Sequence, residues 1–590
     1  MHRISCIYIE NFRACRNVTL PLDSYTPLVG QNNSGKSTIL EAIRWVLKPS
    51  NLKNTDFYDK NKPVIVAACI DGIDDSVLDR IPHNRHRQAI EPYCRDRRLW
   101  IRVTAANTKS KSQEVWSVDE CPQDGVPEHW QAYPTGLPQA VTALLPEPLH
   151  VQAMHDIGED LGKAKTGTTI KGLLDEIMNP LLAAHDELTT ALDTIRNVLT
   201  TGGEQRSDHL QQFDTSATDA LDNFFPGLAL DLDLQVVDIK DFFKAGDLHV
   251  TDKVSGDRRR FDQMGTGAQR AIQMALIRYL ADVRRTEDNQ ISRRLLLIDE
   301  PELYLHPQGV RRLREALKKL SNTGFQVVFS THSPLMLSRD NAPNTVIAGK
   351  TADNGVTVRK PLSQVIKDAI ECAESQSQTL FELGSLVDIY FADRIILCEG
   401  KTERRLLPLT YERLYQRSPD LDNIAFVSVG GCNNFAKALS VLSAMDIRAC
   451  AVADLDFAYT HARKSNLLKR DGTDLIDAKT ALNRLQQEHN FTLHQNGLPK
   501  NSNQWTAADI WACFASDEEG RVIAQESHEA LKAYHVWTWP QGCIEQVTGA
   551  DDKGEDAIME QENQLRAMSA AEIERQMPAF KACFDWIRSL

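Results

Sequence analysis

The sequence lacks the features of membrane-spanning and secreted proteins. No stretch of its 590 residues approaches the length of about 18 uninterrupted apolar side chains that a transmembrane helix needs. The opening segment MHRISCIYIENFRA contains Glu10, Asn11 and Arg13, which interrupt the apolar core that a signal peptide requires. These two absences predict a cytoplasmic protein that has no membrane partner.

Paired cysteines and a positive net charge are also missing. The 12 cysteines include no C-x-x-C pair, which argues against a disulfide scaffold and against a structural zinc site. The net charge of −14 argues against general attraction to nucleic acid, but it does not exclude a local basic groove. With 42% hydrophobic and 25% charged residues, the chain has an ordinary globular composition, and its length predicts several domains.

The hydrophobic pattern changes along the chain. Residues 1 to about 160 are predicted to be rich in strands, at Ile4–Ile9, Val64–Cys69 and Trp100–Thr104. Residues 168–201 carry apolar side chains at helical spacing, and Pro180 is predicted to kink or split this stretch. It is either an amphipathic helix packed on its own domain or an inserted arm that pairs two protomers. Residues 351–390 are predicted to be a connector before a second α/β unit.

A phosphate-binding motif lies near the N-terminus. The run Gly30 to Ser37 fits G-x-x-x-x-G-K-[ST] in full, between apolar Leu28-Val29 and a predicted helix at Ile39–Val46. Its glycines allow backbone N–H groups to converge on phosphate oxygens, Lys36 reaches the β- and γ-phosphates, and the Ser37 hydroxyl can hold Mg²⁺. The predicted ATP-binding residues here are Gly30, Asn33, Gly35, Lys36, Ser37 and Thr38.

Two later strands end in residues suited to nucleotide hydrolysis. The apolar run Leu295–Ile298 leads to Asp299, predicted to bind Mg²⁺, and to Glu300, predicted to orient or deprotonate the attacking water. The strand Val327–Phe329 leads to His332, predicted to sense the γ-phosphate. A lone histidine is usually only a satisfied polar group, but the position of His332 at the end of a strand beside these acids favours the sensor role.

A glycine-rich segment, Met264–Arg270, stands before the helical run Ala271–Ala281. Together with the motifs above it resembles the ABC ATPase heads of the SMC and RecF type. The resemblance implies that Gly265 and Gly267 cap a nucleotide held by a second copy, so the chain would act at least as a head-to-tail dimer. Gln152 is a candidate for the Mg²⁺-sensing glutamine of this family, with an ordinary surface glutamine as the alternative reading.

Acidic residues follow predicted strands in the C-terminal third of the chain. The strand Ile395–Leu397 leads to Glu399, with Glu403 four residues later, and the strand Ala449–Ala453 leads to Asp454 and Asp456. Another predicted strand, Ala425–Val429, lies between them. Because ligands collect at the carboxyl ends of parallel strands, these acids are predicted to gather and to hold Mg²⁺ or Mn²⁺. The alternative is that each acid merely caps a turn or a helix.

The pattern Glu-Gly-x-x-Glu, Gly-Gly and Asp-x-Asp resembles a Toprim domain. An ABC-type head followed by a Toprim domain resembles the OLD-family (overcoming lysogenisation defect) nucleases, including the Gabija nuclease subunit and retron-associated effectors. The resemblance implies an α/β fold, with an ATPase domain at 1–390 that carries a helical insertion at about 160–225, and a Rossmann-like Toprim domain with C-terminal helices at 391–590. It implies Glu399, Asp454 and Asp456 as catalytic metal ligands and Glu403 as support for a second ion.

Nucleases of this kind carry a further acid and a lysine downstream. After a predicted strand at Ala533–Trp537, Glu545 is the candidate metal ligand and Lys553 the candidate that stabilises the charged phosphate. Asp517, Glu518 and Glu519 are rivals for the acid. Local basic clusters occur at Arg258–Arg260, at Arg95 with Arg97 and Arg98, and at Arg404 with Arg405. Solvated surface is the default reading, but Arg404 and Arg405 adjoin the predicted metal site and could hold a phosphate backbone.

Two functions are compatible with these motifs. The first is an ATP-regulated, metal-dependent DNA endonuclease of the OLD type that acts in anti-phage defence, with a helicase-like or reverse-transcriptase protein as a possible defence partner. The second is a DNA-binding structural ATPase of the RecF or SMC kind with a non-catalytic Toprim scaffold. The intact set Glu399, Asp454 and Asp456 favours the nuclease.

Overall fold

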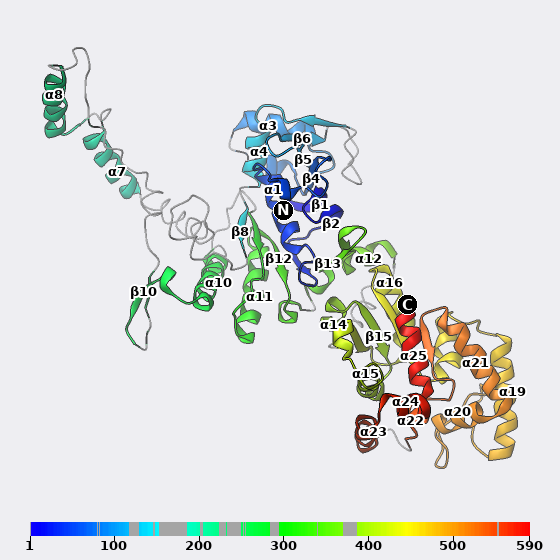
Figure 1. The fold of residues 1–590 in the computed structure, drawn as a ribbon. Helices are drawn as coiled ribbons and strands as arrows, with labels where there is room; N and C mark the ends of the chain where they lie inside the picture. Colours follow the sequence, from blue (N-terminus) through cyan, green and yellow to red (C-terminus); the bar gives the residue numbers. More distant parts are fainter. Residues whose placement is uncertain are drawn as a thin grey trace. The chain divides into compact units, whose positions relative to one another are not determined.

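The structure is a computed structural model of the chain (Figure 1). It describes residues 2–79, 81, 83–116, 129–145, 148–152, 186–200, 205–222, 232, 249–251, 253, 255–283, 294–338, 340–369, 386–550 and 554–590. The chain forms two compact units, the first from residues 1–13, 22–26 and 37–336 and the second from residues 14–21, 27–36 and 337–590. Within the described ranges, no helix has the length and apolar character needed to cross a membrane. The domain boundary expected at residue 390 stays a prediction.

The first unit contains an antiparallel and a parallel group of strands. The antiparallel group has the order β7-β6-β5-β4-β1, and the parallel group joins β8, β11 and β12. The strands are β1 (Arg3–Phe12), β4 (Val64–Asp71), β5 (Arg98–Ala105), β6 (Ser112–Trp116), β7 (Trp130–Ala132), β8 (Leu149–Val151), β11 (Arg294–Ile298) and β12 (Phe325–Thr331). The predicted strands at the N-terminus, in β4 and in β5 are therefore confirmed, each slightly longer than predicted.

Helices alternate with these strands in the first unit, and those at 266–283 and 307–322 pack against the parallel group. The helices are α1 (Lys36–Leu47), α2 (Asp75–Leu78), α3 (Asn84–Ile90), α4 (Leu137–Leu144), α10 (Thr266–Val283) and α11 (Pro307–Asn322). Met274 and Ile277 of α10 and Leu313 and Leu317 of α11 share one buried apolar cluster with the β11 and β12 side chains. This cluster fixes the carboxyl ends of β11 and β12, where the predicted hydrolytic residues lie.

The predicted helical insertion is described only in part. Helices α7 (Asp186–Leu199) and α8 (Asp208–Asp222) lie in it, and a hairpin of β9 (His249–Thr251) and β10 (Arg258–Arg260) follows. Residues 168–185, with the break expected at Pro180, lie outside the described residues. The side chains Arg258–Arg260 are exposed, as expected for a solvated cluster.

The second unit begins with a small mixed group of strands. In it β13 (Val346–Thr351) pairs in parallel with the end of β3 (Tyr25–Val29) and antiparallel with β14 (Gly355–Arg359), which pairs with β2 (Cys15–Pro21). Helices α12 (Leu362–Ala369) and α14 (Leu386–Phe391) follow. The prediction of a plain connector over 351–390 is therefore wrong where the chain is described, because alternating apolar residues form β14 and an amphipathic pattern forms α12.

A four-stranded parallel sheet forms the centre of the second unit. Its order is β16-β15-β17-β18. The strands are β15 (Arg394–Cys398), β16 (Ile424–Ser428), β17 (Arg448–Ala453) and β18 (Val536–Thr538). The last strand is shorter than the predicted Ala533–Trp537, because the chain turns there and His535 takes a left-handed φ of 59°. The strand order reverses beside β15, the place where ligands bind in open α/β sheets.

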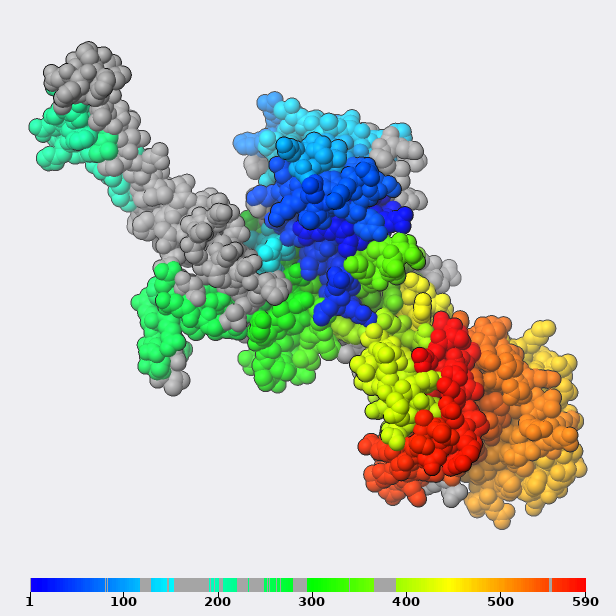
Figure 2. All heavy atoms as spheres, in the orientation of Figure 1, coloured from blue at the N-terminus to red at the C-terminus, as the bar shows by residue number. Residues whose placement is uncertain are grey.

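Helices pack on both faces of this sheet (Figure 1). They are α15 (Lys401–Tyr415), α16 (Phe435–Ala444), α17 (Asp456–Tyr459), α18 (His461–Lys464), α19 (Thr473–His489), α20 (Ala507–Ser516), α21 (Glu518–Lys532), α22 (Ile544–Thr548), α23 (Glu555–Ala567), α24 (Ala570–Gln576) and α25 (Pro578–Ser589). Ile395 and Leu397 point into one core, whereas Ile396 and Cys398 point into the other with residues of α25. Figure 2 shows the C-terminal residues in red at the surface of this unit, beside the orange segment.

Candidate nucleotide site and acidic cluster

The phosphate-binding motif forms the turn between β3 and α1. Gly30 and Gly35 have φ values of +149° and +95°, and an added Cβ would lie 2.1 Å from the Ala348 carbonyl oxygen or 2.3 Å from Val356 Cγ2. Only glycine fits such positions without displacing the neighbouring strands. Asn33 also takes a left-handed φ of 64°. The turn therefore has the compact backbone that the motif predicts, and it leads directly into the helix that begins at Lys36.

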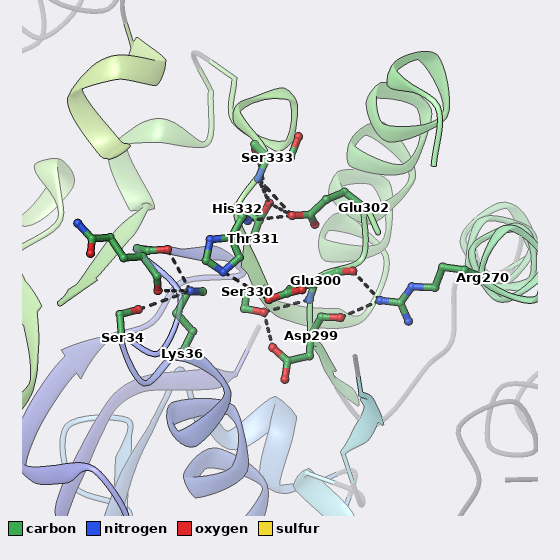
Figure 3. Close-up of polar contacts among 12 residues, drawn as sticks. Ser34, Lys36, Arg270, Asp299, Glu300, Glu302, Ser330, Thr331, His332 and Ser333 are labelled. Carbon is green, nitrogen blue, oxygen red and sulfur yellow. Dashed lines mark hydrogen bonds and ion pairs between the residues drawn. The ribbon is translucent and has the colours of Figure 1, made fainter. Parts of the chain in front are cut away.

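The Lys36 ammonium lies beneath this turn. Its Nζ donates to the carbonyl oxygens of Gly30 and Gln31, both at 3.0 Å, and the side chain is buried (Figure 3). Ser37 and Thr38 follow in the first turn of α1, with Ser37 exposed. A buried cation and the N-terminus of a 12-residue helix together favour an anion at this turn.

A hydroxyl group organises the acids after β11. Ser330, at the end of β12, donates its Oγ hydrogen to Asp299 and accepts the Glu300 N–H at 3.0 Å. His332 Nε2 lies 3.4 Å from Glu300 Oε1 (Figure 3). Glu300 itself has a left-handed φ of 45°, a conformation that costs energy for a residue with a Cβ. The structure thus brings Asp299, Glu300 and His332 together in the first unit.

Glu302 fixes the backbone that carries His332. Its Oε1 accepts hydrogen bonds from Thr331 Oγ1 at 2.7 Å, from the His332 N–H at 2.8 Å and from the Ser333 N–H at 3.2 Å. Burial raises the pKa of the Glu302 carboxyl, while these donors oppose the shift. Sequence reasoning gave this residue no role. Its signal was weak, because a single acid after Pro301 does not reveal three donors that lie about 30 residues later.

Arg270 joins the glycine-rich segment to the same acids through their backbone. It is fully buried in α10, and its Nη2 donates to the carbonyl oxygens of Asp299 and Glu300, both at 2.7 Å (Figure 3). Burial lowers the pKa of the guanidinium to about 10, opposed by the Glu302, Asp299 and Glu300 carboxylates. Gly265 directly precedes α10 and Gly267 is its second residue, so they stand five and three residues before this arginine in the chain.

Gln152 contacts Glu41 of α1 and Arg270 of α10. Its Nε2 donates to Glu41 Oε1 at 3.3 Å, and its backbone oxygen accepts from Arg270 Nη1 at 3.4 Å. The side chain is exposed. Both interpretations of this glutamine stay predictions.

The second cluster of acids lies at the carboxyl ends of the parallel strands. Glu399 follows β15, Asp454 follows β17, and Glu545 lies in α22, shortly after β18. Ligand atoms of Asp454, Cys543 and Glu545 all lie within 4.8 Å of one another. The segments that carry Asp454 and Cys543 are joined by a hydrogen bond, because the Leu455 N–H donates to the Gly542 carbonyl oxygen at 2.7 Å.

A buried thiol extends this cluster toward the other predicted acids. Burial raises the pKa of Cys432, and the negative charges of Glu399, Asp456 and Asp454 raise it further. The thiol is also hydrogen-bonded to Glu399. Asp454 therefore belongs to both groups, and the structure brings Glu399, Asp454, Asp456 and Glu545 together. Sequence reasoning missed Cys432 and Cys543, because isolated cysteines carry no spacing signal.

The remaining predicted residues of this site have varied positions. Glu403 is buried, and its Oε2 accepts the Gly400 N–H at 3.0 Å at the start of α15. Asp517, a rival of Glu545, instead caps α21 through the Gly520 N–H at 3.1 Å and pairs with Arg484. Lys553 lies outside the described residues.

Arg405, a candidate contact to a phosphate backbone, is instead engaged with two glutamates of the same unit. This guanidinium pairs with Glu562 of α23, with Nε–Oε1 and Nη2–Oε2 distances of 2.6 and 2.8 Å, and also with Glu555. Two carboxylates thus neutralise it, so it fastens α15 to α23. Arg404 is exposed.

Comparisons with known proteins agree with the two clusters. The family described as "AAA ATPase domain" matches residues 3–112 and 158–337. The family described as "Overcoming lysogenization defect protein-like, TOPRIM domain" matches residues 390–456, which include Glu399, Glu403, Asp454 and Asp456. The chain therefore has an ATPase domain followed by a Toprim domain, both α/β folds.

Similar proteins were found among solved structures and curated sequences. The match to the Smc head domain with an extended coiled coil from Pyrococcus furiosus covers 62% of this chain and 98% of that domain, at 15% identity and a TM-score of 0.37. The OLD nuclease of Thermus scotoductus is 23% identical over 76% of this chain and 81% of its own length. The Old nuclease of Escherichia phage P2 is 31% identical over 93% of this chain and 94% of its own length. The protein thus belongs to the OLD nuclease family.

Proposed function

We propose that the chain is a divalent-metal-dependent DNA endonuclease whose cutting is regulated by ATP, and that it acts in anti-phage defence. The observation that carries the proposal is the gathering of Asp454, Glu545 and Cys543 within 4.8 Å, with Glu399 and Asp456 around the adjacent Cys432. Carboxylates packed this closely repel one another, and a cation relieves the repulsion. The names of the relatives support nuclease activity, and the defence role is inferred from the family resemblance.

The donor set fits hard divalent cations. Glu399, Asp454, Asp456 and Glu545 offer carboxylate oxygens, which suit Mg²⁺ and Mn²⁺. When bound, two such ions would activate a water and stabilise the leaving oxygen of a cut phosphodiester bond. We assign Glu399, Asp454 and Asp456 as principal ligands and Glu545 as an additional one. Glu403 as a supporting ligand and Lys553 as the stabilising cation remain parts of the proposal that rest on the resemblance.

The ATPase domain would hydrolyse ATP. Lys36 and the N-terminus of α1 would bind the phosphates, and Ser37 and Asp299 would hold Mg²⁺. Glu300 is the proton acceptor that we assign, and His332 is positioned beside it at 3.4 Å. Ser330 and Glu302 are positioning residues, because they fix Asp299 and the His332 backbone. Gly265 and Gly267 would cap the nucleotide of a second copy, so we propose at least a dimer.

A plasmid-cutting assay tests the nuclease. Purified protein is incubated with supercoiled plasmid and Mg²⁺ or Mn²⁺, with and without ATP, beside the variants Asp454→Asn and Asp471→Asn. Asp471 is an exposed acid of the same unit and serves as the matched control. We expect nicked or linear product from the wild type and the control, and none from Asp454→Asn or with a chelator. Cutting that persists in Asp454→Asn would overturn the site assignment, and a difference between the ATP lanes gives the sign of regulation.

A further inference from the structure

A cavity at the amino-terminal edge of the C-terminal sheet is lined by three arginines. Arg394 is the first residue of β15, Arg448 is the first residue of β17, and Arg588 lies near the end of α25. The cavity has a volume of about 310 Å³ and is also lined by Tyr411 and by Asp393 and Asp422. We call it the arginine cavity. Its volume is near the lower end of the range for small-molecule sites.

The pairing of the strands brings two of these arginines together. Arg394 and Arg448 are direct partners in the parallel ladder of β15 and β17. The five residue steps from Arg394 to Glu399 span about 16 Å of extended chain, so the arginine cavity and the acidic cluster lie at opposite edges of one sheet. The cavity is therefore a separate site and not an extension of the acidic cluster.

The three guanidiniums form no direct ion pair with a described carboxylate, although the charge of Arg588 helps to lower the pKa of Asp585. Arg394 Nη1 donates to the Ile587 carbonyl, and the Arg588 guanidinium lies 4.6 Å from the Tyr415 ring centroid. In the part of the chain that the structure describes, none of Arg394, Arg448 and Arg588 forms an ion pair with a carboxylate. Burial lowers the pKa of Arg394, and the nearby charges of Arg448 and Arg588 lower it further. Three cations that repel one another around one cavity favour an anionic ligand.

The two acids of the cavity are already engaged elsewhere. Asp422 Oδ2 accepts the Tyr411 hydroxyl at 2.6 Å, and Asp422 Oδ1 lies 2.9 Å from Arg417 Nε. Asp393 Oδ2 accepts from Gln31 Nε2 at 2.9 Å and from Asn423 Nδ2 at 3.1 Å. These contacts leave the guanidiniums of the cavity available to an incoming anion.

We propose that the arginine cavity binds a phosphate group, carried either by a nucleic-acid strand or by a free phosphorylated ligand. Guanidinium groups suit phosphate because their N–H donors form paired, charge-assisted hydrogen bonds with its oxygens. Arg448 and Arg588 are exposed and supply most of the accessible donors, whereas Arg394 also fastens α25 through the Ile587 carbonyl. The proposal goes beyond the cutting activity and does not depend on it.

A binding experiment without metal tests this site separately from cutting. The full chain with Lys36→Ala, which removes the cation of the phosphate-binding turn, is titrated in chelator in two arms. One arm measures the anisotropy of a short labelled DNA duplex, and the other measures pyrophosphate binding by calorimetry. Each arm compares the parent with Arg448→Ala/Arg588→Ala, with the corresponding lysine pair, and with Arg521→Ala as the matched control. Arg521 is an exposed arginine of the same unit on α21.

We expect the alanine pair to weaken binding by about tenfold for each arginine, the lysine pair to lose less, and Arg521→Ala to match the parent. If the phosphate belongs to DNA, only the first arm changes, and the slope of log affinity against log salt falls by about 1 for each arginine removed. If it belongs to a free ligand, the pyrophosphate arm changes. Equal binding by the parent and the alanine pair in both arms, or no binding by the parent, would overturn the proposal. Thermal unfolding of each variant shows whether it is folded.

Discussion

The acids after β11 and the acids after β15 and β17 both lie at the carboxyl ends of parallel strands, yet their surroundings differ. In the first unit, Ser330 donates to Asp299, and Glu302 accepts three hydrogen bonds from the His332 segment. In the second unit, Glu399, Asp454 and Asp456 surround the Cys432 thiol, and Glu545 lies beside Asp454 and Cys543.

This difference shows that acids at the carboxyl ends of parallel strands can suit either the orientation of a reacting group or the binding of cations. Acids that receive several donors from the protein have fixed positions, which suits the orientation of a water or a histidine. Acids that lie among other acids and thiols create a concentrated negative potential, which suits the binding of cations. Substitutions in the first cluster should therefore change hydrolysis, and substitutions in the second should change cation binding.

The largest effect should come from Glu300→Gln. The amide keeps the size of the side chain but cannot accept the proton of the attacking water, so ATP hydrolysis should fall by about 10²- to 10⁴-fold. Nucleotide binding should stay near the wild-type level, because Lys36 and the phosphate-binding turn are unchanged. Phosphate release and binding of a fluorescent nucleotide measure the two quantities. Exposed Glu315 provides the control Glu315→Gln, and normal hydrolysis by Glu300→Gln would contradict the assignment.

Substitutions in the two clusters should have different effects on the affinity for Mn²⁺. Asp454→Asn should weaken Mn²⁺ binding measured in the absence of nucleotide by at least about tenfold, because a charged ligand shared by both halves of the cluster is lost. Glu302→Ala should leave this affinity unchanged. It should instead destabilise the first unit by about 2–3 kcal/mol, because three donors lose their acceptor. A loss of metal affinity in both variants would erase the distinction between the clusters.

Only the second cluster contains cysteines among the described residues that surround its acids. A bound Cd²⁺ ion should therefore produce a thiolate-to-metal charge-transfer absorption in the wild type. Cys543→Ser should reduce this absorption, whereas Cys513→Ser, at a partly buried cysteine of α20, should leave it unchanged. An unchanged spectrum in Cys543→Ser would show that its thiol does not contact the ion.

The smallest effect concerns the pH dependence of the second unit. His528 is buried, its Nδ1 lies 2.8 Å from the Thr538 carbonyl oxygen, and burial lowers its pKa. The unfolded chain therefore binds a proton more readily, so stability should fall as the pH decreases below about 6.5. His528→Gln should reduce this dependence and exposed His494→Gln should not, as measured by thermal unfolding at about pH 7.5 and about pH 5.5. A parallel pH dependence in all three proteins would exclude His528 as the cause.

Much of the fold and of both sites could be predicted from local sequence. The phosphate-binding turn needs specific residues at fixed spacing, so Gly30, Gly35 and Lys36 were identified directly. Glu399 and Asp454 follow short apolar runs, and the rule for the ends of parallel strands placed them together. Each of these signals lies within about ten residues of sequence.

Contacts between distant segments could not be predicted in this way. Arg405 was read by default as solvated surface and as a candidate for phosphate, but its partner Glu562 is 157 residues away and can be recognised only once α15 and α23 pack. Asp517 was a rival of the candidate Glu545 by sequence, and only the folded chain places Glu545 beside Asp454 and pairs Asp517 with Arg484. Local sequence contained no signal that Arg394 and Arg448 are neighbours. Their contact follows from the register of β15 against β17.

The packing of α25 has a consequence for the timing of synthesis. Phe580, Phe584 and Ile587 complete the core on the face of the sheet that contains Ile396 and Cys398. The strand that presents Glu399 is therefore made long before the helix that covers it. At a translation rate of about 5–20 residues per second, the intervening segment takes roughly 10–40 s to synthesise. Until then this face of the sheet has no complete core, so the strand that presents Glu399 gains its full packing only after α25 has been made.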